Sequence, residues 1–302
     1  MKTIEKYLLL VLSVAMTLAC TKNDFSENDN SFKIFVNTLD TKTTNNGMST
    51  IWSSGDRIMV SYALTGSQDY VNAGRFNLSN EATGEFKPHR SAPSLSDGSY
   101  YDWYVFYPFN SQHTVTNSAG QTIGCLSSQS QTQIGNNTMG HLAGSNFPLY
   151  GSVKNIAATD YPNIKLKNVA SVIEFSITNK LSKQISISKI SLEIPETNIV
   201  GSFNIDYSSE PVSLTPTMDS MVSSSVTLNV TNGAMLEPDG VGKFYIGIAP
   251  VTVPEGLPLL VNIYVTDGTN EADDMLEKEI TESLEFKSGT INTLNLNFTR
   301  IF

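Results

Sequence analysis

Cys20 is the residue whose type and position predict a specific chemistry. Two lysines near the start of the chain precede an apolar run, 7–19, that is too short to span a bilayer and fits the core of a secretory signal. The small residue Ala19 directly before Cys20 predicts cleavage there and acylation of the thiol, although the usual leucine lies one place late. We therefore expect a lipoprotein signal peptide over residues 1–19 and lipid attachment at Cys20, which would anchor the chain because each buried methylene contributes about 0.8 kcal/mol. The alternative is an ordinary cleaved signal with an incidental cysteine.

The other reactive side chains form no catalytic pattern. The three histidines, His89, His113 and His141, have no second histidine, cysteine or aspartate at metal-ligand spacing. No G-x-S-x-G nucleophile motif occurs, and Gly240-Val241-Gly242 lacks the later glycine of a dinucleotide loop. We expect no catalytic residues, no metal site and no cofactor, and a protein that is not an enzyme.

An acidic stretch and an aromatic run could each form a binding site, but each also has a purely structural explanation. The acidic stretch 267–274 carries oxygens that could bind calcium, but its spacing does not match an EF-hand and favours a solvated hairpin loop. The aromatic run 100–109 could form an exposed platform for stacking sugars. A core strand is favoured instead, because Trp103, Val105 and Tyr107 would share one face. Exposed indoles at Trp103 or Trp52 would support sugar binding.

Composition narrows the class of protein. The 302 residues carry a net charge of −10, only 16% charged residues and 40% hydrophobic residues. The negative charge argues against a nucleic-acid partner, because phosphate binding needs clustered lysine and arginine. Abundant serine, threonine and asparagine fit an extracellular β-protein with polar loops.

Alternating apolar and polar residues predict strands throughout the chain, and no long helical period competes with them. A one-residue slip in the alternation at Ser188-Lys189 predicts a β-bulge. The polar segment 127–146 is expected to be a long loop. The expected strands cover 32–36, 57–62, 74–78, 84–86, 103–107, 122–126, 150–153, 164–166, 173–177, 185–194, 203–205, 226–230, 244–248, 259–265 and 294–298.

Strands at this spacing, with glycine, proline and aspartate turns between them, favour β-sandwiches. Residues 20–31 are acidic and poor in apolar side chains, so we expect a disordered tether. A boundary near residue 160 would divide the rest into an N-terminal sandwich, 32–160, and a C-terminal sandwich, 161–302.

Several motifs, in their order along the chain, resemble the fimbrillin family, the type V pilins of Bacteroides-type bacteria. The opening strand 32–36 is followed by Thr41-Lys42-Thr43 and then by 52–58, WSSGDRI. The run 106–109, FYPF, and the closing segment 288–298 also resemble that family. The resemblance covers nearly the whole chain after the tether.

The resemblance implies an all-β fold of two tandem transthyretin-like β-sandwich domains. It also implies assembly: a lipid-anchored precursor reaches the outer membrane and cell surface, a protease removes the N-terminal strand, and a strand of the next subunit replaces it. Phe32, Ile34 and Val36 alternate as such an exchangeable strand should. The partners would be other pilin subunits and a host or bacterial adhesion ligand.

Two departures from the family pattern bear on its role. The arginine at which such precursors are cleaved has no counterpart here, and Lys42 stands in the corresponding region as the candidate processing site. The chain also ends four residues after Phe298. Both features favour a tip or anchor subunit over a stalk subunit. The alternative function is a non-polymerising surface lipoprotein that binds glycans or host ligands.

Overall fold

The computed structural model describes residues 32–38, 52–109, 121–206, 212–217, 222–266 and 274–299, and side chains within these ranges except those of 38, 121–125, 145, 274 and 275. This part of the chain is all-β and forms several sheets. Every strand that alternation predicts overlaps an observed strand. Within the described ranges, the longest helical segments have three residues, and none is long and apolar enough to cross a membrane.

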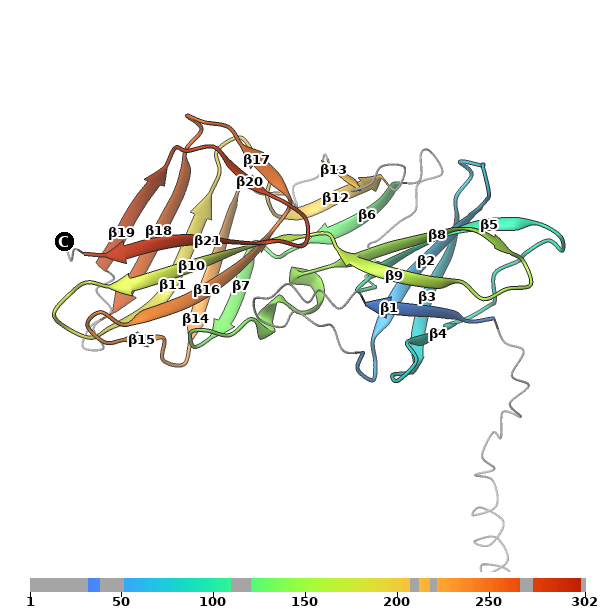
Figure 1. Ribbon diagram of the computed structural model, residues 1–302, viewed down its shortest axis with the longest axis horizontal. Helices are drawn as coiled ribbons and strands as arrows, with labels where there is room; N and C mark the ends of the chain where they lie inside the picture. The colour runs from blue at the N-terminus through green and yellow to red at the C-terminus, as the bar shows by residue number, and fades with distance from the viewer. Residues whose placement is uncertain are drawn as a thin grey trace, which may run out of the picture. The chain divides into compact units, whose positions relative to one another are not determined.

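The first group of strands forms a closed sheet around an apolar core (Figure 1). Apolar side chains alternate along its strands and meet inside it, which excludes water from one face. In spatial order the strands are β1 (Ile34–Thr38), β4 (Glu85–Pro88), β3 (Val71–Asn80), β2 (Arg57–Leu64), β5 (Tyr100–Tyr107), β8 (Leu149–Ala157) and β9 (Asn163–Asn168).

Two larger sheets in the second half of the chain share another apolar core, which is lined by side chains of both. One has the order β16 (Val241–Ile248), β10 (Ser171–Asn179), β21 (Ile291–Phe298). The other has the order β19 (Asp274–Ile280), β18 (Leu259–Thr266), β11 (Ile185–Glu193), β14 (Ser225–Thr231), β7 (Ser130–Ile134), with β15 (Met235–Leu236) also paired to β11. Packing of two sheets over one core is the arrangement of a β-sandwich.

The remaining elements are short. One small sheet has the order β13 (Ser213–Pro216), β12 (Gly201–Asp206), β6 (Gln121–Leu126), and another pairs β17 (Val251–Val253) with β20 (Leu284–Phe286). Two 3₁₀ turns, η1 (Gly140–Leu142) and η2 (Gly144–Asn146), follow β7. A third apolar cluster joins side chains of the closed sheet, such as Phe106, to side chains from later strands, such as Phe203 and Tyr245.

Strand pairings cross the expected domain boundary at residue 160, which stays a prediction. β9 follows that boundary but pairs with β1, whereas β6 and β7 precede it and pair with β12 and β14. Strands from each side of residue 160 therefore pair with strands from the other side.

The expected bulge is confirmed, because the register between β11 and β18 shifts between Ile187 and Lys189. The expected loop over 127–146 is wrong, since it contains β7. The alternating inward side chains of β7 are glutamines, Gln131 and Gln133, and their amides hydrogen-bond the backbone of β16. A strand whose buried residues are polar has no hydrophobic period to detect.

Candidate functional site

The first strand, β1, is a member of the closed sheet, and its two neighbours, β4 and β9, come from distant parts of the chain (Figure 1). It runs antiparallel to β4, with Ile34 opposite Phe86. It runs parallel to β9, with Val36 opposite Ile164. The strand that the sequence singled out as exchangeable is thus an integral member of a sheet.

The apolar side chains of β1 complete the core of the closed sheet. Ile34 and Val36 are 0% exposed. Phe32 lies just before the strand, half-buried, and stacks on Trp103 at 5.1 Å between ring centroids. Full burial of an aliphatic side chain of this size contributes about 1.5–3 kcal/mol. A strand that replaced β1 would have to offer apolar side chains at the same alternate positions.

Backbone contacts fix the position of β1 closely at Val36. The Val36 amide donates to the carbonyl of Gly84 at 2.8 Å. The indole Nε1 of Trp52 donates to the Val36 carbonyl at 2.9 Å. Gly84 has a left-handed φ of +63°, and a Cβ built on it would lie 2.2 Å from the Val36 oxygen. At position 84, only glycine therefore fits without displacing β1.

Polar groups connect β1 to both neighbours at its surface. The Lys33 ammonium lies 3.3 Å from Glu85 of β4, and the Asn37 amide donates to the side chain of Asn163 in β9 at 2.9 Å. Burial raises the pKa of Glu85, but a hydrogen bond from Ser79 and the nearby lysine ammonium groups outweigh it, so the pKa lies below its usual value.

The remaining predictions from the sequence concern a lipid site, a processing site and an acidic stretch. Cys20 and Lys42 lie outside the described residues, as does 267–273 of the acidic stretch. Among the residues that the structure describes, no three histidine, cysteine, aspartate or glutamate side chains are grouped to hold a metal ion.

The aromatic run 100–109 forms the core strand expected of it. Trp103 and Val105 point into the closed sheet, while Tyr104 and Phe106, on the opposite face, are buried in the third apolar cluster. Both indoles are buried: Trp103 is 1% and Trp52 7% exposed. Neither offers a flat exposed face for a sugar.

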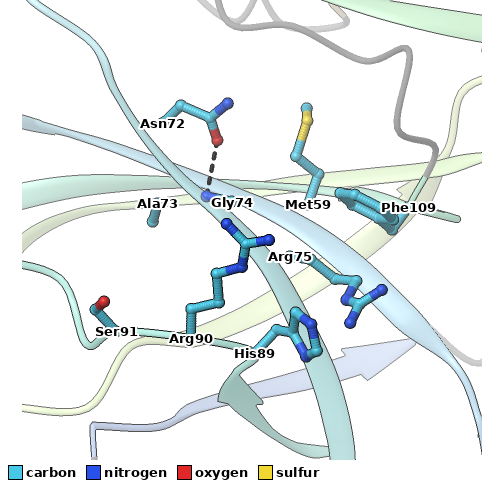
Figure 2. A pocket seen from close by; sticks show the side chains of 9 residues that line it. All are labelled: Met59, Asn72, Ala73, Gly74, Arg75, His89, Arg90, Ser91 and Phe109. Atoms are coloured by element: carbon cyan, nitrogen blue, oxygen red, sulfur yellow. Dashed lines mark hydrogen bonds between the residues drawn. The ribbon is translucent and has the colours of Figure 1, made fainter.

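A pocket of about 430 Å³ opens beside β2, β3 and the residues that follow β4 (Figure 2). Arg75, His89 and Arg90 contribute its charged or titratable side chains, and Met59 and Phe109 contribute apolar ones. Among the described residues that line it, none is acidic. Desolvation and the guanidinium groups nearby lower the pKa of His89.

This pocket was not predicted from the sequence, although one signal was present. The chain has four arginines, and Arg57, Arg75 and Arg90 all act on His89 electrostatically. Their clustering over a short stretch of an acidic protein could have been noticed. Their convergence depends on the pairing of β2, β3 and β4, which arginine spacing alone does not reveal.

Solved structures similar to this fold come from Bacteroides species. A "putative cell adhesion protein" of Bacteroides ovatus aligns with a TM-score of 0.56 and 13% identity over 89% of this chain and 92% of its own. A second protein so described, from Bacteroides uniformis, aligns with a TM-score of 0.53 and 13% identity over 89% of this chain and 94% of its own. A fimbrial protein of Bacteroides vulgatus aligns with a TM-score of 0.46 and 11% identity over 89% of this chain and 96% of its own.

No protein-family model matches the chain. No curated protein sequence matches it either. By its fold, the chain is similar to the solved cell adhesion structures from Bacteroides ovatus and Bacteroides uniformis.

Proposed function

We propose that this protein is an adhesive structural subunit of a cell-surface fimbria, lipid-anchored at Cys20 and built of two tandem transthyretin-like β-sandwich domains. Assembly would proceed by strand exchange at β1. The observation that carries the proposal is that the first described strand completes the core of a closed sheet. The fold shared with the two cell adhesion structures supports it.

Removal of β1 would leave a slot of defined chemistry. The carbonyls of Gly84 and Pro162 would lose the amide donors of Val36 and Phe35. The core positions that Ile34 and Val36 fill would become empty. An incoming strand with alternating apolar residues would restore both sets of contacts, which is β-augmentation. An unfilled slot would expose strand edges that promote aggregation.

Processing would occur between β1 and β2, with Lys42 as the candidate site. Cleavage there leaves β1 held only by noncovalent contacts with β4, β9 and the core beneath them. A processed subunit could then release its first strand to a neighbour's strand.

A disulfide lock tests this mechanism. Phe35 and Glu85 are register partners on antiparallel β1 and β4, so cysteines at both positions satisfy the Cα spacing of a disulfide. A recognition site for a specific protease replaces the residues around Lys42, and the cut protein is mixed with a fluorescent peptide of sequence 32–38. We expect the cut protein to take up the peptide, measured by fluorescence anisotropy, and the oxidised lock to prevent uptake.

A matched control carries a cysteine pair at Thr178 and Val241, register partners on β10 and β16 away from β1. It should take up peptide as the unlocked protein does, and reduction should restore uptake to the Phe35–Glu85 lock. If the unlocked cut protein keeps its own strand and takes up no peptide, exchange at β1 is refuted.

The alternative of glycan capture on exposed indoles has lost its main support, because Trp52 and Trp103 are buried. Neither of the chain's two tryptophans is available as a stacking surface.

A further inference from the structure

The pocket beside β3 concentrates positive charge in an acidic protein. The chain has a net charge of −10 and four arginines, of which Arg75 and Arg90 line this one pocket and Arg57 lies within electrostatic range of its histidine. Like charges brought together repel each other. Within the described part of the chain, none of the three forms an ion pair that would offset this repulsion.

Arg75 directly follows a β-bulge in β3. The register between β2 and β3 shifts between Val60 and Ser61, which leaves an extra residue in β3 before Gly74. Gly74 has a φ of +82°, and its amide donates to Asn72 Oδ1 at 2.7 Å (Figure 2). A β-bulge re-aims the side chains beside it, here Arg75.

Arg75 retains hydrogen-bonding capacity. Its Nε is buried and, among the described residues, has no hydrogen-bond partner. Its guanidinium carbon lies 5.8 Å from the centre of the Phe109 ring, so the aromatic side chain supports one side of it. Unsatisfied buried donors are uncommon in folded proteins, so the Nε of Arg75 is an unusual feature of this site.

We propose that this pocket binds a sugar that carries a carboxylate. Guanidinium groups present paired donors in a plane that matches a carboxylate. Phe109 and Met59 supply an apolar wall for the hydrophobic face of a sugar ring, and Asn72 retains amide hydrogens for its hydroxyl groups. The volume of about 430 Å³ lies within the range of small-ligand sites, about 300–1,000 Å³.

The site is separate from the strand-exchange proposal. None of the described residues that line it belongs to β1, and three of them, Ala73, Gly74 and Arg75, lie at the bulge in β3. A subunit that exchanges strands and one that does not could both use it.

NMR titration of the full chain tests the proposal with paired sugars that differ in the acid group. Galacturonic acid, glucuronic acid and N-acetylneuraminic acid are compared with neutral galactose and glucose. We expect saturable binding of at least one acid, with shifts confined to β2, β3 and the residues after β4, and at least about tenfold weaker binding of its neutral counterpart or of galactose.

Two variants and one matched control separate binding from folding. Arg90→Gln changes an exposed side chain and should leave the melting temperature unchanged while it weakens binding at least about tenfold. Arg75→Gln should weaken binding at least as much. Lys278→Gln removes one positive charge from an exposed position on β19 and should leave binding unchanged.

Three results would overturn the proposal. One is that none of the three acids binds at millimolar concentration. Another is that Arg90→Gln, still folded, binds an acid as wild type does. The third is that sodium sulfate or an aspartate-rich peptide binds as tightly as the best sugar acid, because the pocket would then recognise an anion or a protein segment and not a sugar.

Discussion

Substituting Gly84 by alanine should loosen β1 specifically. A Cβ at this position would lie 2.2 Å from the Val36 carbonyl oxygen and 3.1 Å from Nε1 of Trp52. Real Cβ atoms essentially never come within 3.0 Å of another heavy atom, so the backbone of β1 or of Gly84 must move. Both close contacts are on atoms that hold β1 in the sheet.

The magnitude has two parts. The left-handed conformation of residue 84, with φ of +63°, costs an alanine about 1–2 kcal/mol. Displacement of β1 weakens the bond from the Val36 amide to Gly84 and the bond from Trp52 to Val36. At about 1–1.5 kcal/mol for each weakened bond, a further loss of about 2–3 kcal/mol follows.

Gly98 provides a matched control that separates these parts. It also has a left-handed conformation, with φ of +74°, but a Cβ built on it meets nothing within 4 Å. Gly98→Ala should therefore show only the conformational cost. Urea denaturation of the full chain measures the free energy of unfolding of each variant, and hydrogen exchange measures protection of the β1 amides. Equal losses of stability for Gly84→Ala and Gly98→Ala, with β1 equally protected, would refute the steric argument.

Three other predictions concern separate features. Gln133→Leu should lower the free energy of unfolding by about 1–3 kcal/mol, because the buried Tyr245 amide of β16 loses its acceptor, whereas the Lys243 carbonyl keeps the Asn137 amide as a donor. A loss below about 1 kcal/mol in urea denaturation would contradict it. Because the pKa of Glu85 is depressed, its contribution to stability should be complete above its unfolded pKa and lost as the pH falls through its folded pKa. Glu85→Gln should therefore melt below wild type at neutral pH and at the same temperature as wild type in strong acid. An equal difference in melting temperature at both pH values would count against the assignment. Fatty-acid labelling of cells should mark the wild-type chain and not Cys20→Ala, and a labelled variant would exclude this lipid site.

Alternation was sufficient to predict most strands, because in the core of a β-protein the side-chain period is set by burial on one face. It failed at β7, where Gln131 and Gln133 are 1% and 0% exposed. Each amide both donates to and accepts from the β16 backbone and so substitutes for a neighbouring strand along that edge. Polar side chains in this role carry no hydrophobic signal.

The order of strands could not be predicted in the same way. β1 pairs with β9, which lies more than one hundred residues later in the chain, and local sequence contains no information about such a partner. Gly84 was expected to begin a strand, 84–86, and nothing in its local sequence marked it as the residue that β1 approaches. β1 was predicted as a strand, and its contacts required the structure.

β4 connects the two features proposed for this protein. It contacts β1 through Glu85 and Phe86 and ends directly before His89 and Arg90 of the pocket. In the part of the chain that the structure describes, Arg90 makes no strand pair with β1, and the disulfide between β1 and β4 alters no residue that lines the pocket. A locked protein that still binds a sugar acid would therefore show that sugar-acid binding does not depend on strand exchange. A locked protein that lost binding would show instead that β4 must move for the pocket to accept its ligand.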